Sequence, residues 1–266
     1  MAGSLHATAV GAPDAPRSIL MLHGIYGRGR NWQAIARMLV ERRPDYRCLL
    51  VDLPWHGASA PGRHGPTVAG VAADLSQWLD EQDVRPDAIL GHSFGGKVAL
   101  SLADTRADAP LQIWIIDSTP ESGPPSGSAW RMLGAVRALP DRFASREDLI
   151  SSLAGDGWAR PVAQWMATNL DRDGDTFVWR LDFDVMEALI RSFAGTDLWA
   201  GVETGAPGRT CHFVKATNSD VLSDSAVERL GSAGRAHVEL HTLEGSHWIH
   251  AERPDAVVDL LAGSLA

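Results

Sequence analysis

A serine flanked by glycines is the feature of this sequence best suited to chemistry. The run Gly91-His-Ser93-Phe-Gly95-Gly96 follows a short apolar stretch and opens a segment with helical spacing. In a sharp turn from strand to helix, side chains at positions 91 and 95 would collide, and glycine removes that collision. The turn would expose the Ser93 hydroxyl at a helix N-terminus, where an oxyanion is stabilised. The spacing therefore predicts a nucleophilic serine rather than an ordinary glycine-rich loop.

A second loop has the composition needed to stabilise negative charge on a substrate oxygen. It is His23-Gly-Ile25-Tyr-Gly27, directly after the apolar run at residues 18–22. The backbone N–H groups of Ile25 and Phe94 would together form the two donors of an oxyanion hole. The glycine spacing of this loop does not fit a dinucleotide fingerprint. We expect no cofactor.

The base that would activate Ser93 is predicted to be His247, in the run Gly245-Ser-His247-Trp-Ile-His250. A serine hydroxyl is a poor nucleophile until a base takes its proton. We interpret His250 as a packed or helix-capping residue, and we expect the side chain of His92 to point away from the nucleophile. The histidines expected to orient loops are His23 and His56.

Metal and disulfide chemistry are not expected. A metal site would need a carboxylate or thiol to complete the set His237, His241, His247 and His250, and we identify none. Cys48 and Cys211 lie in apolar, strand-like segments, where cysteine behaves as a small hydrophobic residue.

The elements that must position these residues alternate between strand and helix. Strands are predicted at residues 18–22, 47–51, 88–90 and 111–116, with helices at 31–40, from Val71 to near Pro86, and at 95–103. The alternation resumes with strands at 211–215 and 237–242 and helices at 223–230 and 254–261. Apolar strands that alternate with helices indicate a mostly parallel sheet covered by helices.

Between these two parts the pattern changes. No strand-like run is predicted from residue 126 to 211, and five of the ten tryptophans fall in this interval. We interpret it as a helical insertion over the carboxyl edge of the sheet. Trp130, Trp165 and Trp179 are the side chains expected to roof Ser93 with apolar surface.

Taken together, the motifs resemble those of the α/β-hydrolase fold, and more narrowly those of the bacterial YbfF-type carboxylesterases. The narrower resemblance rests on His23-Gly-Ile-Tyr-Gly27, Trp179-Arg180 and His247-Trp-Ile-His-Ala-Glu-Arg-Pro254. It implies an α/β-hydrolase core at residues 1–118 and 209–266 and a helical cap at residues 119–208, inserted after the strand that ends near Asp117. The substrate-binding residues expected on this basis are His23, Tyr26, Trp130, Trp165, Trp179 and Trp248.

The acid that orients His247 has two candidates. In most of the family the acid follows the strand predicted at residues 211–215, where this sequence has Ser219, with Asp220 one residue late. Asp117 instead ends an earlier strand at the sheet edge that bears Ser93, as in the YbfF-type esterases that the chain resembles. We favour Asp117 and keep Asp220 as the alternative acid.

These residues predict a serine hydrolase that cleaves carboxylic esters, or thioesters, of short to medium acyl chains. The same residues could cleave amides or carbon–carbon bonds, and a small-molecule receptor on the same fold is the alternative from another class. The chain has 24 basic and 33 acidic residues, a net charge of −9. Because binding phosphates requires a positive surface, nucleic acid is not expected as a partner. No apolar run is long enough to span a membrane and residues 1–10 do not resemble a secretory signal, so we expect a cytoplasmic monomer or small homo-oligomer acting on a small-molecule ester.

Overall fold

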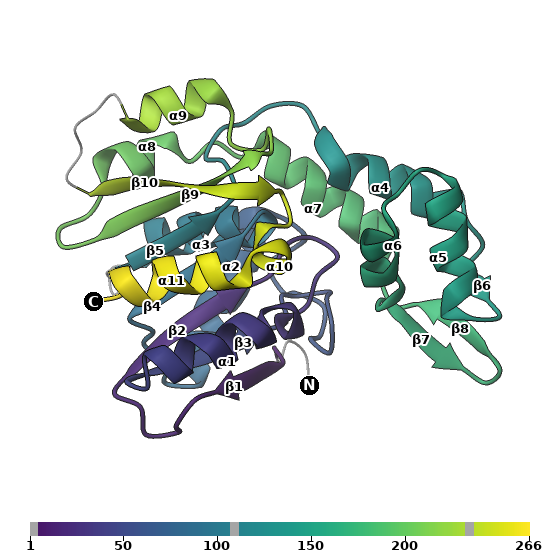
Figure 1. Ribbon diagram of the computed structural model, residues 1–266, viewed down its shortest axis with the longest axis horizontal. Coiled ribbons are helices and arrows are strands. Elements are labelled where there is room, and N and C mark those ends of the chain that lie inside the picture. Colours follow the sequence, from purple (N-terminus) through teal and green to yellow (C-terminus); the bar gives the residue numbers. More distant parts are fainter. Residues whose placement is uncertain (1–4, 107–111, 232–236) are drawn as a thin grey trace.

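A seven-stranded sheet forms the centre of the molecule, as seen in a computed structural model that describes residues 5–106, 112–231 and 237–266 (Figure 1). The strand order is β1-β3-β2-β4-β5-β9-β10, with β1 antiparallel to β3 and all other pairs parallel. The strands are β1 (Ala7–Val10), β2 (Arg17–Leu22), β3 (Tyr46–Val51), β4 (Ala88–His92), β5 (Gln112–Ile116), β9 (Thr210–Asn218) and β10 (Val238–Ser246). Because β2, β4, β5, β9 and β10 run the same way, their carboxyl ends meet at one edge.

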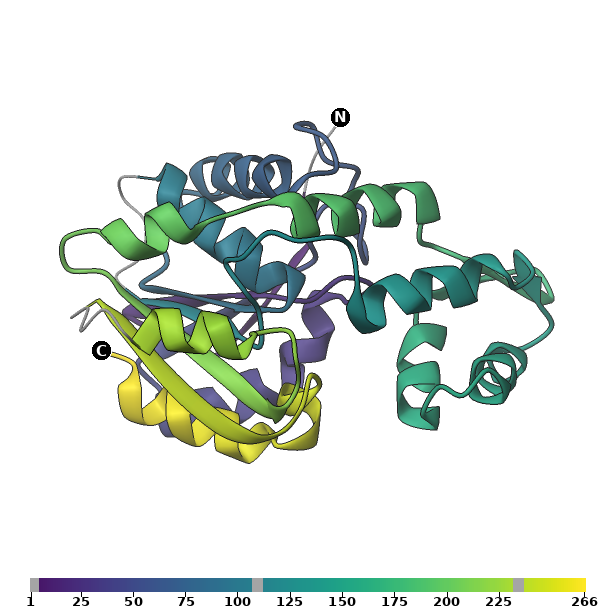
Figure 2. The same ribbon diagram turned by 90° about the horizontal axis from the view of Figure 1, so that it is seen from above.

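Helices cover both faces of the sheet (Figures 1 and 2). On one face lie α1 (Gln33–Arg42), α10 (Ile249–Glu252) and α11 (Pro254–Ser264), and a short 3-10 turn, η1 (Gly29–Trp32), precedes α1. On the other lie α2 (Val68–Glu81), α3 (Phe94–Thr105), α8 (Trp199–Thr204) and α9 (Asp224–Gly231). Two layers of buried aliphatic side chains therefore hold the sheet between the helices.

The predicted alternation of strands and helices is confirmed, with changes at the ends of elements. Strands β9 and β10 extend beyond their predicted limits to Asn218 and Ser246, and Leu111, predicted to begin a strand, lies outside the described residues. The edge strand β1 was not predicted, because its four residues are partly buried or exposed and form no continuous apolar run. Both cysteines are buried and unbridged, as expected.

The cap differs from its prediction in one respect, because it is not only helical. It contains α4 (Gly127–Arg137), α5 (Arg146–Gly155), α6 (Arg160–Ala167) and α7 (Phe183–Gly195), and also the antiparallel sheet β6 (Arg142–Phe143), β8 (Thr176–Trp179) and β7 (Leu170–Asp173). The expectation of no strand between residues 126 and 211 is therefore wrong. These strands have only two to four residues each and are mostly partly buried or exposed, so the one apolar run, at residues 177–179 of β8, was not recognised as a strand. The two-residue turn Gly174-Asp175, in which Gly174 has a φ of 60°, was the available signal.

The cap is tied to the core by a buried ammonium group. Lys97 of α3 is fully buried, and its Nζ donates to the carbonyl oxygens of Glu121 at 2.7 Å, Phe193 at 2.7 Å and Thr196 at 2.9 Å. These three carbonyls lie on the segments that enter and leave the cap. Helix α8, which follows them, packs on α3 of the core. In Figure 2 the rest of the cap extends sideways from the sheet.

Within the described part of the chain, none of the helices combines the length and the apolar character that crossing a membrane requires.

Candidate active site

Ser93 sits in a strained turn between β4 and α3. Its φ of 51° and ψ of −117° are rarely adopted by a residue with a side chain, and such strain persists only where the surroundings enforce it. A Cβ on Gly91 would lie 2.2 Å from the carbonyl oxygen of Gly95, and one on Gly95 would lie 2.6 Å from the backbone of Leu22. Gly91 is therefore required by the turn itself, as predicted, whereas Gly95 is required by the close approach of the end of β2.

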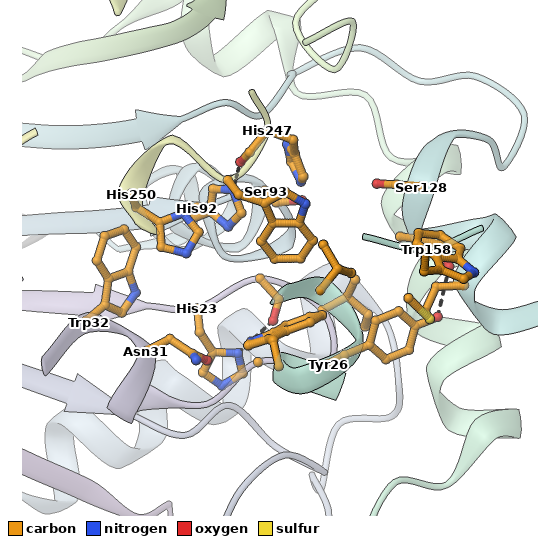
Figure 3. A pocket seen from close by; sticks show the side chains of 18 residues that line it. His23, Tyr26, Asn31, Trp32, His92, Ser93, Ser128, Trp158, His247 and His250 are labelled. Atoms are coloured by element: carbon orange, nitrogen blue, oxygen red, sulfur yellow. Dashed lines mark hydrogen bonds between the residues drawn. The ribbon is translucent and has the colours of Figure 1, made fainter. Parts of the chain in front are cut away.

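His247 and Asp117 meet at the carboxyl edge of the sheet. The Nδ1 atom of His247 lies 2.6 Å from Oδ2 of Asp117, and both His247 and Ser93 line one pocket (Figure 3). Because a carboxylate only accepts hydrogen bonds, the proton of the imidazole is on Nδ1, which leaves the Nε2 lone pair free to act as a base. The structure thus brings together the serine, the histidine and the favoured aspartate.

The Asp117 carboxylate is fully buried and is stabilised by three donors. Besides His247, it accepts hydrogen bonds from the Ser219 hydroxyl at 2.6 Å and from the backbone N–H of Ala216 at 3.2 Å. Ser219, the residue at the usual position of the acid, therefore orients the carboxylate that replaces it. Asp220 is exposed, and its side chain has no hydrogen bond to any residue that the structure describes. The geometry favours Asp117 over Asp220.

The loop expected to supply an oxyanion donor lies directly beside the nucleophile. A Cβ on Gly24 would lie 3.4 Å from Cβ of Ser93. Ile25 lines the pocket, while Phe94 is the first residue of α3, so its N–H has no partner within the helix. Tyr26, with a φ of 63°, is held by the cap, since its carbonyl accepts from Nδ2 of Asn169 at 2.8 Å.

His23, predicted to orient a loop, is fully buried behind this loop. Its Nε2 accepts a hydrogen bond from the backbone N–H of Leu53 at 2.9 Å. Burial, with a smaller contribution from the neighbouring His56, lowers the pKa of His23 to about 3. Burial likewise lowers the pKa of His56 to about 4. Both rings are therefore neutral at physiological pH.

His92 and His250 form a row with Trp32 on one side of Ser93 (Figure 3). The ring centroids of His92 and His250 are 4.2 Å apart, and His250 lies 5.1 Å from Trp32. Nε2 of His92 lies 2.8 Å from the backbone oxygen of His247, so His92 fixes the loop that presents the base. The prediction that His92 points away from the nucleophile is therefore wrong, because it lines the same pocket. His250 packs against His92 and Trp32, as expected, and it also lines the pocket.

Acid is expected to destabilise the fold through the buried histidines. Burial holds the pKa values of His23, His56 and His92 below the ordinary 6.5, so the unfolded chain binds protons that the folded chain does not. The free energy of unfolding therefore has its full value above pH 6.5 and falls as the pH is lowered. Each such histidine contributes a fall of up to about 1.4 kcal/mol per pH unit. Urea unfolding between pH 7.5 and 5 measures how the free energy of unfolding changes with pH. In His56→Gln this slope should be smaller by the contribution of one histidine. A free energy of unfolding that stays constant over this range would contradict the assignment.

The walls of the pocket are apolar and come partly from the cap. Its described lining residues are His23, Gly24, Ile25, Tyr26, Gly27, Asn31, Trp32, His92, Ser93, Ser128, Ala129, Met132, Trp158, Val162, Trp165, His247, Trp248 and His250. Four of the residues expected to bind substrate are among them: His23, Tyr26, Trp165 and Trp248. A wider cleft shares Trp158 and Trp165 with this pocket and opens between α6 and α10.

Two tryptophans expected in the roof are not part of the pocket. The ring of Trp179 contacts Phe143 and Phe183 inside the cap, and Trp130 packs under the guanidinium of Arg191. Their prediction as substrate-binding residues is therefore not supported by the geometry. Trp158 lines the pocket instead, and its sequence context had no feature that distinguished it from the other cap tryptophans.

Comparison with known proteins agrees with this arrangement. A model of the alpha/beta hydrolase family matches residues 19–260. The chain belongs to the alpha/beta hydrolase family. The predicted fold class is thereby confirmed, with the mostly parallel sheet and flanking helices that the family shares.

Relatives of this alpha/beta hydrolase include proteins named as esterases and lipases. It is 27% identical to esterase YbfF of Escherichia coli, over 90% of this chain and 89% of that protein. It is 25% identical to the mouse sn-1-specific diacylglycerol lipase ABHD11, over 94% of this chain and 81% of that protein. The solved structure of a marine microorganism esterase shares the fold, with a TM-score of 0.83 at 22% identity, and covers 97% of this chain and 98% of its own. The resemblance to YbfF predicted from the motifs is confirmed.

Proposed function

We propose that this alpha/beta hydrolase cleaves carboxylic esters of small molecules through an acyl-enzyme on Ser93. The observation that carries the proposal is the 2.6 Å contact between Nδ1 of His247 and the buried Asp117 carboxylate, beside a serine in a strained turn. Relatives named as esterases and lipases support ester bonds as the substrate class. The reaction requires no cofactor.

In the first half of the reaction, Nε2 of His247 takes the proton of the Ser93 hydroxyl as its oxygen attacks the ester carbonyl. The backbone N–H groups of Ile25 and Phe94 donate to the oxyanion that forms. His247 then gives its proton to the departing alcohol, which leaves an acyl group on Ser93. Asp117 keeps the imidazole in the required tautomer and stabilises its charged form.

In the second half, water replaces the alcohol. His247 takes a proton from this water, which attacks the acyl carbonyl, and the same oxyanion donors act again. Collapse of the intermediate returns the proton to Ser93 and releases the acid. Hydrolysis of p-nitrophenyl esters by the purified protein, with Ser93→Ala as the blank, tests the proposal. Saturable hydrolysis by the wild type that is absent in Ser93→Ala would support the proposed function. A wild type that hydrolyses none of the esters would contradict it.

Short to medium acyl chains are expected to be preferred. Trp165 and Trp248 meet edge to face, with ring centroids 4.6 Å apart, and together with Met132 they limit the length of an acyl group next to Ser93. We expect kcat/KM to be highest for p-nitrophenyl butyrate or hexanoate and lower for the palmitate.

The variant Trp165→Ala is expected to shift this preference to longer chains, because it removes one side of the wall. Trp130→Ala is the matched control, since Trp130 lies in the cap but outside the pocket. An unchanged chain-length profile in Trp165→Ala, or equal shifts in both variants, would show that the wall is misassigned.

The rate is expected to depend on a single ionisation. A histidine that acts as a base must be neutral, so kcat/KM for an ester should rise with pH as the base loses its proton. His23 and His250, whose pKa values burial lowers to about 3 and about 4, remain neutral over this range and add no step. A rate profile from pH 5 to 9 measures the step. A flat profile, with chemistry limiting the rate, would contradict the role of His247.

A further inference from the structure

A second cluster of chemistry-bearing side chains lies on strands β9 and β10. His212 and Glu239 are direct partners in the parallel register, and His241 lies two residues beyond Glu239, so all three side chains lie on one face of the sheet. Nδ1 of His212 lies 3.2 Å from Nε2 of His241 and 3.3 Å from Oε2 of Glu239. The three atoms form a triangle, because Nε2 of His241 also lies 3.6 Å from Oε2 of Glu239.

These three distances fit the face of a coordination tetrahedron. Zinc binds imidazole nitrogen at about 2.0–2.1 Å and carboxylate oxygen at about 2.0–2.2 Å, so two ligands of a tetrahedral ion lie about 3.3–3.5 Å apart. Two nitrogens and one carboxylate oxygen also form a donor set that zinc uses. The imidazole that donates in the His212–His241 contact needs only to move its proton to its other ring nitrogen, and both rings then present lone pairs.

The surroundings hold the cluster in place and leave one side open. The His212 ring is stacked on Trp114, with centroids 3.9 Å apart and planes inclined by 4°, and only 2% of the residue is exposed. The side chain of Glu239 is 54% exposed and that of His241 is 20% exposed. Strand β10 lies at the edge of the sheet, so solvent can reach the cluster (Figure 1). A fixed ligand on the inner side and an open outer side suit an ion with three protein ligands and one water.

We propose that His212, Glu239 and His241 bind one Zn²⁺ ion, with water as the fourth ligand. The expectation that no carboxylate accompanies His241 is wrong, because Glu239 lies two residues earlier on the same face and the strand register adds His212. Along β9, His212 lies four residues, roughly 13 Å at an extended rise per residue, before Ala216, whose N–H donates to the Asp117 carboxylate. The ion therefore joins β9 to the edge strand β10 and takes no part in ester cleavage.

Titration of the tag-free full chain with ZnCl₂ in a calorimeter tests the proposal. We expect one ion per chain and, with Zn²⁺ in excess, a rise of several degrees in Tm, because a ligand that binds only the folded state stabilises it. Co²⁺ in place of Zn²⁺ should give the visible absorption of a tetrahedral site. His241→Gln should raise the Zn²⁺ Kd by about 100-fold or more and abolish the rise in Tm.

Two further variants complete the test. Glu239→Gln, at the exposed corner of the cluster, should also weaken binding and serves if His241→Gln does not fold. His64→Gln is the matched control, because His64 lies 2.8 Å from one carboxylate, that of Asp74, and no third ligand lies with them among the residues that the structure describes. It should bind Zn²⁺ like the wild type, and ester hydrolysis should be unchanged in every variant. No binding by the wild type, or equal binding by wild type, His241→Gln and Glu239→Gln, would overturn the proposal.

Discussion

Asp117→Asn is expected to lower kcat for ester hydrolysis by up to about 10⁴-fold, by analogy with the serine protease triad. The amide has nearly the shape of the carboxylate, but its NH₂ group would face Nδ1 of His247 across a contact of 2.6 Å. The imidazole would then carry its proton on Nε2, where it cannot accept the proton of Ser93. Steady-state kinetics on one p-nitrophenyl ester measure the loss. The KM should change much less than kcat, because the carboxylate is buried behind His247 and does not contact substrate.

Asp220→Asn is the matched control for this loss. The residue lies in the loop that usually bears the acid, but it is exposed and its side chain has no hydrogen bond to a described residue. We expect its kcat to remain within about twofold of the wild type, as for a surface substitution. If Asp220→Asn lost most of its kcat while Asp117→Asn kept nearly the wild-type kcat, the acid would lie on the later loop.

The position of Ser219 allows the charge to be returned by a second substitution. Its hydroxyl lies 2.6 Å from the same Asp117 oxygen that His247 contacts. The double variant Asp117→Asn with Ser219→Asp is therefore expected to recover part of the activity lost in Asp117→Asn. Recovery of activity would show that His247 needs a negative charge next to its Nδ1 atom, whichever strand supplies the carboxylate.

Ser93→Ala is expected to lower kcat by at least about 10³-fold, because a residue that acts as the nucleophile cannot be replaced by its neighbours in the triad. The fold should be retained, since the Ser93 side chain makes no hydrogen bond to any described residue and alanine accepts the same backbone as serine. Far-UV circular dichroism and urea unfolding check the fold, and the p-nitrophenyl ester assay measures the loss. A folded Ser93→Ala protein that retained most of its activity would refute the mechanism.

Residues in tight turns and apolar strands could be predicted from the sequence, because local physics fixes them. Gly91 and Gly95 follow from the collision that a side chain would cause, and the strands that precede Ser93 and Asp117 follow from their apolar runs. Asp117 could be favoured over Asp220 because it ends an apolar strand and because the YbfF-type esterases that the chain resembles have their acid there, and the structure places the ends of β4 and β5 side by side. These parts of the site depend on short segments of chain.

Contacts between distant segments could not be predicted in the same way. Nothing in the spacing distinguishes Trp158, which lines the pocket, from Trp179, which fills the interior of the cap. The bond from Ser219 to Asp117 depends on how far β9 continues past its apolar part. Likewise, His212 meets Glu239 only because of the register between β9 and β10. Such pairings are set by tertiary packing, which the local sequence pattern does not encode.

The most direct test of the central claim, that Ser93 carries the acyl group, is mass spectrometry of the protein after reaction with a fluorophosphonate. This probe reacts with an activated serine and remains attached. The account predicts one adduct per chain, located on the peptide that contains Ser93, with complete loss of ester hydrolysis and no adduct in Ser93→Ala. An adduct on a different residue, or full labelling of Ser93→Ala, would contradict it.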